Sequence, residues 1–181
     1  MFGNLLKMGR KMVSDAWDVA EGEFKRITNK RALVAFCSVG YMIGVSDYDA
    51  TEHKLLEDAY DADERIGTLN LIKTNPATEA FDDDDISDAF SEATKMYNGP
   101  VAMMPGHAVK KMGDDKVVKL LKEFAGTDNA EPLMEAACMV VWGDGKIEQG
   151  EVDALDTVGS ALGYNPSAIQ GFKDKFAIAI T

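Results

Sequence analysis

The sequence predicts an all-α fold, and three observations support this. Apolar residues recur at steps of three and four through most of the chain, which is the spacing of one helix face. Met is frequent, with ten residues, and runs of β-branched residues are few. No segment reads as a strand with alternating apolar and polar residues. We therefore expect a bundle of seven to nine helices.

The first predicted element is an amphipathic helix, with apolar residues at helical spacing from Phe2 to Ile27. Residues 1–31 hold seven basic and four acidic side chains, a net charge of +3, so the remainder must carry −15 to give the overall −12. The basic first half could lie on an anionic membrane, but the polar face turns acidic from Asp15 onward. We expect residues 1–30 to form a basic amphipathic helix. Residues 1–28 would dock it on the bundle or on a protein partner, with membrane contact at most peripheral.

The next two helices follow from apolar periodicity and capping signals. Residues 31–45 form the most apolar segment, and their uncharged stretch is too short to span a bilayer, which is typical of a buried core helix. A short loop then leads to Asp49, three residues before Glu52, a pattern that predicts a helix cap. We expect the helix that follows to end near Ile66, because Gly67 is a stop signal.

The middle of the chain is less regular. The four aspartates at 82–85 are either a solvated loop or the start of a helix that continues over 87–97. The MMPGH stretch at 103–107 predicts a turn. Asp114 or Asp115 would then begin a helix over 116–125, with Gly126 as its stop.

The last third of the chain contains three more predicted helices. They span 130–142, 148–162 and 166–178. The last begins at Asn165, an N-cap residue that precedes Pro166 at the first helical position. We therefore expect one helical domain over 31–181, with halves at about 31–100 and 101–181.

A repeated pattern relates the two halves. In each, an apolar helix ends in an acidic loop, and an amphipathic helix follows. Asp47 and Asp144 occupy matching places after the apolar helices, and the Asp49–Glu52 spacing matches that of Glu148 and Glu151. This pattern indicates an internal duplication and a pseudo-two-fold bundle.

The second loop, GDGKIEQGE, has two open interpretations. It is not an EF-hand, because the positions that should supply the first two ligands are Val140 and Trp142. Asp144, Glu148 and Glu151 could still converge on a divalent cation, since hard cations take six or more oxygen ligands. Alternatively, the loop is only a helix start, with Glu148 as the cap and Glu151 closing a capping box.

Composition disfavours other classes of function. A net charge of −12 argues against nucleic acid as a partner, because such binding needs Lys and Arg on phosphates. Cys37 and Cys138 each lie in an apolar run and are expected to be buried thiols.

His53 is expected to be exposed and His107 to lie in a turn. Neither has a Glu three residues before it, and the chain contains no phosphate loop or nucleophile elbow. The start of the chain lacks a secretory signal. We expect a non-enzymatic protein that is cytoplasmic or assembled into a virion there.

Three segments resemble the tellurite-resistance family TerB, and the resemblance extends over nearly the whole chain. They are the lead FGNLLKMGRKMVSDAWDVAEGEFKRITNKRAL, the stretch AFDDDDISDAFSEATKMY and the most specific one, GDGKIEQGEVDALDTVGSALGYNP. The resemblance implies an all-helical bundle with two pseudo-symmetric halves and an acidic metal-binding surface, with Ca²⁺ the first candidate. The first loop departs from the family pattern, because SDYD replaces the longer Asp-Gly-Lys-Ile type of loop. The metal-binding positions that the resemblance implies are Asp144, Glu148 and Glu151 in the second half and Asp47, Asp49 and Glu52 in the first.

Two functions are therefore expected. The leading one is a TerB-like module that binds a divalent cation through its acidic loops and acts through protein association in a stress or tellurite-resistance assembly. The alternative is a structural or adaptor subunit, for example a phage virion component, that keeps the fold without needing metal.

Overall fold

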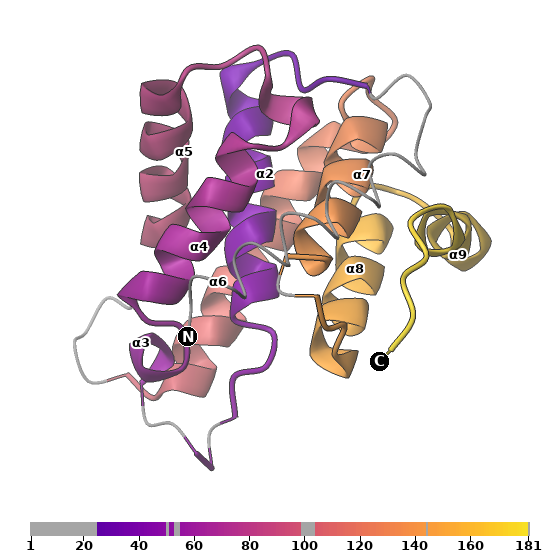
Figure 1. The fold of residues 1–181 in the computed structure, drawn as a ribbon. Helices are drawn as coiled ribbons and strands as arrows, with labels where there is room; N and C mark the ends of the chain where they lie inside the picture. The colour runs from indigo at the N-terminus through magenta and orange to yellow at the C-terminus, as the bar shows by residue number, and fades with distance from the viewer. Residues whose placement is uncertain (1–24, 50, 53–54, 99–103, 144, 181) are drawn as a thin grey trace.

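The computed structural model describes residues 25–49, 51–52, 55–98, 104–143 and 145–180. Within these residues the chain forms eight α-helices, two short 3-10 turns and no strand, so the all-α prediction is confirmed (Figure 1). The predicted N-terminal helix lies almost wholly outside the described residues. The elements are α2 (Lys30–Gly44), α3 (Leu56–Ala59), α4 (Ala62–Lys73), η1 (Pro76–Thr78), α5 (Asp83–Met96), α6 (Gly106–Leu121), η2 (Lys122–Phe124), α7 (Ala130–Val141), α8 (Gln149–Ala161) and α9 (Pro166–Lys175).

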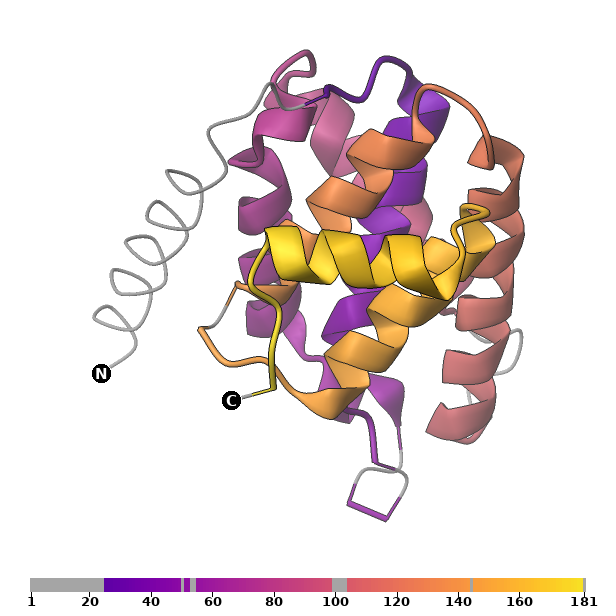
Figure 2. The ribbon, with the colours of Figure 1, turned by 90° about the vertical axis from the view of Figure 1, so that its right-hand side faces the viewer.

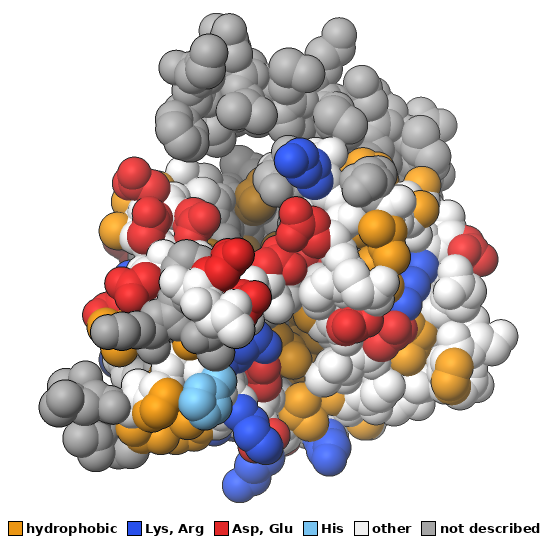
Figure 3. Space-filling view, turned by 90° about the horizontal axis from the view of Figure 1, so that it is seen from below, with side chains coloured by type: hydrophobic (Ala, Val, Ile, Leu, Met, Phe, Trp, Pro, Cys, Tyr) orange, Lys and Arg blue, Asp and Glu red, His pale blue; other side chains and the backbone are white. Residues whose placement is uncertain are grey.

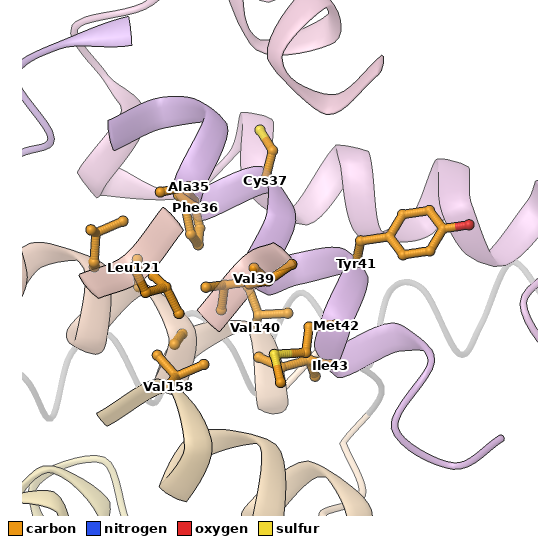
Figure 4. Close-up of a cluster of buried hydrophobic side chains, with 14 of the residues drawn as sticks. Ala35, Phe36, Cys37, Val39, Tyr41, Met42, Ile43, Leu121, Val140 and Val158 are labelled. Atoms are coloured by element: carbon orange, nitrogen blue, oxygen red, sulfur yellow. The ribbon is translucent and has the colours of Figure 1, made fainter. Parts of the chain in front are cut away.

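The core is built around α2 and α7, the two most apolar helices. Nearly all of their residues are buried, and α2 packs against α4, α5, α6, α7 and α8. Figure 4 shows Phe36 and Val39 of α2 among side chains from the neighbouring helices, including Leu121, Val140 and Val158. Each large apolar side chain buried in this way contributes about 1.5–3 kcal/mol. Helices from both predicted halves therefore share one core.

Side-chain caps begin several of the helices. Asn29 accepts a hydrogen bond from the Ala32 N–H at 2.9 Å at the start of α2. At the start of α5, Asp82 accepts from the Asp85 N–H at 2.8 Å. The following aspartates lie in the first turn, where the helix dipole favours negative charge. The run at 82–85 is therefore a helix start rather than a loop.

The prediction of one helix over 49–66 is wrong. Asp49 does not begin a helix, because its carboxylate accepts from the Thr51 N–H at 2.7 Å in a turn. The short helix α3 forms instead, and α4 starts afresh at Asp61, whose carboxylate accepts from the Glu64 N–H at 3.0 Å. Nor does Gly67 end that helix, since α4 continues to Lys73.

The predicted start of the helix at 116 is also wrong. Helix α6 begins at Gly106, directly after Pro105, and the predicted turn at 103–107 overlaps its first residues. Asp114 and Asp115 lie inside the helix, where they pair with Lys110 and Lys111 one turn earlier, at 2.7 and 2.8 Å.

The C-terminal helices α7, α8 and α9 begin as predicted. Figure 2 shows α9 lying across α7 and α8. Helix α9 ends at Lys175 rather than at 178, because Ala177 adopts a left-handed φ of 50° and the chain turns back. The Trp142 indole N–H then donates to the Phe176 carbonyl at 2.8 Å, which fixes the returning chain to the end of α7. In the part of the chain that the structure describes, no helix has the length and apolar character needed to cross a bilayer.

The two cysteines are buried free thiols, as predicted. Burial raises the pKa of Cys37 and of Cys138 to about 12. A raised pKa keeps each thiol protonated, and the thiolate is the form that reacts.

We expect neither cysteine of the folded protein to react with a disulfide thiol reagent at pH 8, whereas both should react in urea. Rapid reaction of either thiol in the native protein would contradict this burial.

Candidate loop junction

The two acidic loops meet at the start of α8. The first loop follows α2, and its Ser46 and Asp47 approach Gly150, which lies in the first turn of α8. A Cβ placed on Gly150 would lie 2.6 Å from Asp47 Oδ1 and 3.0 Å from the Ser46 carbonyl oxygen, so only glycine permits this approach. Both loops lie at the lower end of the bundle in Figure 1. We call this contact between residues 46–47 and 148–151 the loop junction.

Some of the predicted metal-binding residues lie at this junction, and the others lie near it. Asp47 and Glu148 are exposed, and Glu151 is partly buried. Asp144 lies outside the described residues. Among the residues that the structure describes, no three His, Cys, Asp or Glu side chains stand close enough together to hold a metal ion. Any cation site at the junction would therefore need Asp144, backbone carbonyls or water in addition to these carboxylates.

The second loop also contains the contact that the capping interpretation expects. The Glu148 N–H donates to Glu151 Oε2 at 3.0 Å, and Glu148 is the residue that precedes α8. Gly145 has a φ of 83°, a conformation that L side chains rarely adopt. Ile147 is fully buried and holds the loop against the core. One oxygen of Glu151 is therefore used in starting the helix.

Asp49 and Glu52 form a turn outside the junction contact. Asp49 Oδ1 accepts from both the N–H and the hydroxyl of Thr51, each at 2.7 Å. The Glu52 N–H donates to the Asp49 carbonyl oxygen at 3.2 Å. The spacing that Asp49 and Glu52 share with Glu148 and Glu151 thus produces a turn in the first loop and a helix start in the second.

Sequence reasoning did not identify Ser46, Tyr48 and the start of α6 as neighbours. They line a hollow of about 490 Å³, together with His107 and the lysine and aspartate pairs of α6. The Ser46 hydroxyl is shielded from solvent and has no hydrogen-bond partner in the described structure. The Tyr48 hydroxyl packs closely on Gly106, since a Cβ there would lie 2.2 Å from it. His107 lies in the first turn of α6 and is exposed. No motif marks these residues in the sequence.

A partly buried network connects α5 and α6 near this hollow. The Tyr97 hydroxyl donates to Asp114 Oδ1 at 2.8 Å, and Lys110 donates to Asp114 Oδ2 at 2.7 Å. Burial, followed by the nearby Asp114 carboxylate, raises the pKa of Tyr97 well above its usual value. The Tyr97 phenol therefore stays protonated and acts as a fixed hydrogen-bond donor between α5 and α6.

Comparison of the chain with protein-family models, with curated proteins and with solved structures finds no match. The resemblance to TerB therefore rests on three segments of the sequence.

Proposed function

We propose that this protein is a TerB-like, non-enzymatic module that binds one divalent cation at the loop junction and acts through protein association. The observation that carries this proposal is the approach of Ser46 and Asp47 to Gly150. Two loops that are about 100 residues apart in the sequence meet there, as a shared site from two duplicated halves would require. The metal that fits best is Ca²⁺.

The chemistry of the junction suits a hard cation. Ca²⁺ takes six to eight oxygen ligands from carboxylates, backbone carbonyls and water. Asp47 and the Ser46 carbonyl could supply oxygens from the first loop. Glu148 and Glu151 could supply carboxylate oxygens from the second. Asp144 precedes the left-handed Gly145 in the same loop. A bound ion would tie the end of α2 to the start of α8 and could change which surface a partner meets.

The alternative function is a structural or adaptor subunit that needs no metal. The hydrogen bond from the Glu148 N–H to Glu151 favours it, because this contact begins α8 without any ion. In that case the same bundle would serve as a rigid body, with residues 1–28 as the docking segment.

Thermal unfolding tests the choice between these functions. We expect Ca²⁺ to raise the melting temperature above its value in chelator. A ligand that binds only the native state stabilises it by an amount that grows with ligand concentration. At a concentration of one hundred times Kd, the free energy of unfolding rises by about 2.7 kcal/mol. Mg²⁺, Mn²⁺ and Zn²⁺ serve as comparison ions. The double variant Asp144→Asn/Glu151→Gln should lose the rise. A wild-type melting temperature that no cation changes would support the metal-free alternative.

A further inference from the structure

Helix α6 carries a cluster of basic side chains on an otherwise acidic protein. It carries four lysines against two aspartates, and Lys122 follows directly, in a chain whose net charge is −12. Lys119 makes no ion pair with any described residue, and the Lys111–Asp115 pair is largely exposed to water. These lysines therefore have charge available for a partner.

The lysines border a shallow groove along one face of α6. A hollow of about 460 Å³ is lined by Ala108, Met112, Lys111, Asp115, Lys116 and Lys119, which recur at steps of three and four. The apolar floor consists of Ala108 and the partly buried Met112, a flexible side chain that adapts to different partners. The groove therefore has an apolar centre with a mainly basic border.

This groove continues into the hollow that Ser46, Tyr48 and the start of α6 line. The two hollows share Lys111 and Asp115, so together they follow more than three turns of α6. Ser46 lines the far end, and its buried hydroxyl has no hydrogen-bond partner among the described residues. Figure 3 shows the molecule from below, where basic side chains and a histidine gather at the edge of a surface otherwise rich in Asp and Glu.

We propose that this α6 groove docks an acidic amphipathic helix of a partner protein. Such a helix would place aliphatic side chains on Ala108 and Met112 and its carboxylates beside Lys111, Lys116 and Lys119. The charge of the border matches this occupant and gives it specificity over basic helices.

An anionic membrane fits the same surface less well. The large apolar side chains that are exposed in the described structure are Leu55, Ile66 and Ile180, and none of them lies on α6. The groove thus offers little apolar area for insertion into lipid, and a chain of net charge −12 is repelled by an anionic bilayer.

The inference rests on the association part of the proposed function but not on the cation. The groove shares the turn at 46–48 with the loop junction, yet its lysines and Met112 belong to α6. Binding of a peptide and response to a cation are therefore separate measurements, and either can fail alone.

The test uses a fluorescein-labelled helical peptide of Leu, Ala and Glu, with Leu along one face and Glu on both flanks. We expect the full-length protein to bind it in chelator, with affinity that falls as salt rises, and with amide NMR shifts concentrated at residues 106–119. The variant Lys111→Glu/Lys119→Glu should weaken binding by about tenfold or more. Lys30→Glu/Lys95→Glu changes the charge equally at exposed positions on α2 and α5, outside the groove, and should bind like the wild type.

Four results would overturn the proposal. They are no binding of the peptide, equal weakening by both double variants, equal binding of a peptide with Lys in place of each Glu, and shifts located away from α6. Two further experiments assign the groove to another occupant if positive. Binding to vesicles of phosphatidylglycerol and phosphatidylcholine that Lys111→Glu/Lys119→Glu abolishes would assign it to a membrane. Self-association in sedimentation that the same variant abolishes would assign it to a second copy.

Discussion

The variant Lys175→Ala should lower the free energy of unfolding by about 2–3 kcal/mol, because it leaves a buried carboxylate without its partner. Lys175 of α9 pairs with Glu135 of α7, whose side chain is 3% exposed. The second carboxylate oxygen of Glu135 is buried and has no hydrogen-bond partner in the described structure. We place the loss below that of a fully buried pair, since the Lys175 side chain is 45% exposed.

A double-mutant cycle in urea checks this assignment. Glu135→Met replaces the carboxylate with an apolar group of similar size and should itself be neutral or stabilising. In that background Lys175→Ala should cost no more than about 0.5 kcal/mol, as for an ordinary surface substitution. An equal cost in both backgrounds would show that Lys175 stabilises α9 through its packing rather than through its charge.

The variant Gly113→Ala should destabilise the protein by about 1–3 kcal/mol, because α6 contacts the Tyr97 ring closely at this position. A Cβ on Gly113 would lie 2.2 Å from Tyr97 Cδ1. The ring cannot move away freely, since it stacks on Tyr41 at 4.5 Å between centroids and its hydroxyl bonds Asp114. This clash outweighs the gain of about 1 kcal/mol that Ala brings to a helix interior.

Gly67→Ala is the matched control within a helix. No atom lies within 4 Å of a Cβ placed on Gly67, apart from the helix and its chain neighbours. The control should therefore stabilise the protein by about 0.5–1 kcal/mol. Urea unfolding of both variants measures the difference. Stabilisation by Gly113→Ala would contradict the packing of α6 on Tyr97.

Local signals were sufficient for the helices that start at strong caps. Asn29, Glu148 and Asn165 begin α2, α8 and α9 close to where the sequence predicted. Local signals failed where tertiary packing determines the helix boundary. Gly67 was read as a stop, but α4 continues because Thr68 and Ile72 are buried against the core. Gly106 was read as a turn, but α6 starts there and packs on Tyr48 and Tyr97.

The candidate site was predictable only in part. The sequence identified both acidic loops, because Asp, Glu and Gly gather there after apolar helices. Their meeting at Gly150 depends on how α2 and α8 pack, which no local pattern reports. Ser46 and Tyr48 were missed for the same reason: their environment comes from α6, more than 50 residues further along the chain.

A calorimetric titration of the full-length protein with Ca²⁺, after removal of metal by chelator, tests the central claim most directly. We predict one ion per chain, weakened binding in Asp47→Asn, and weakened binding also in Gly150→Ala. The latter variant keeps every carboxylate but displaces Ser46 and Asp47 from α8. No heat of binding, two ions per chain, or unchanged binding in both variants would contradict a single cation site shared by the two loops.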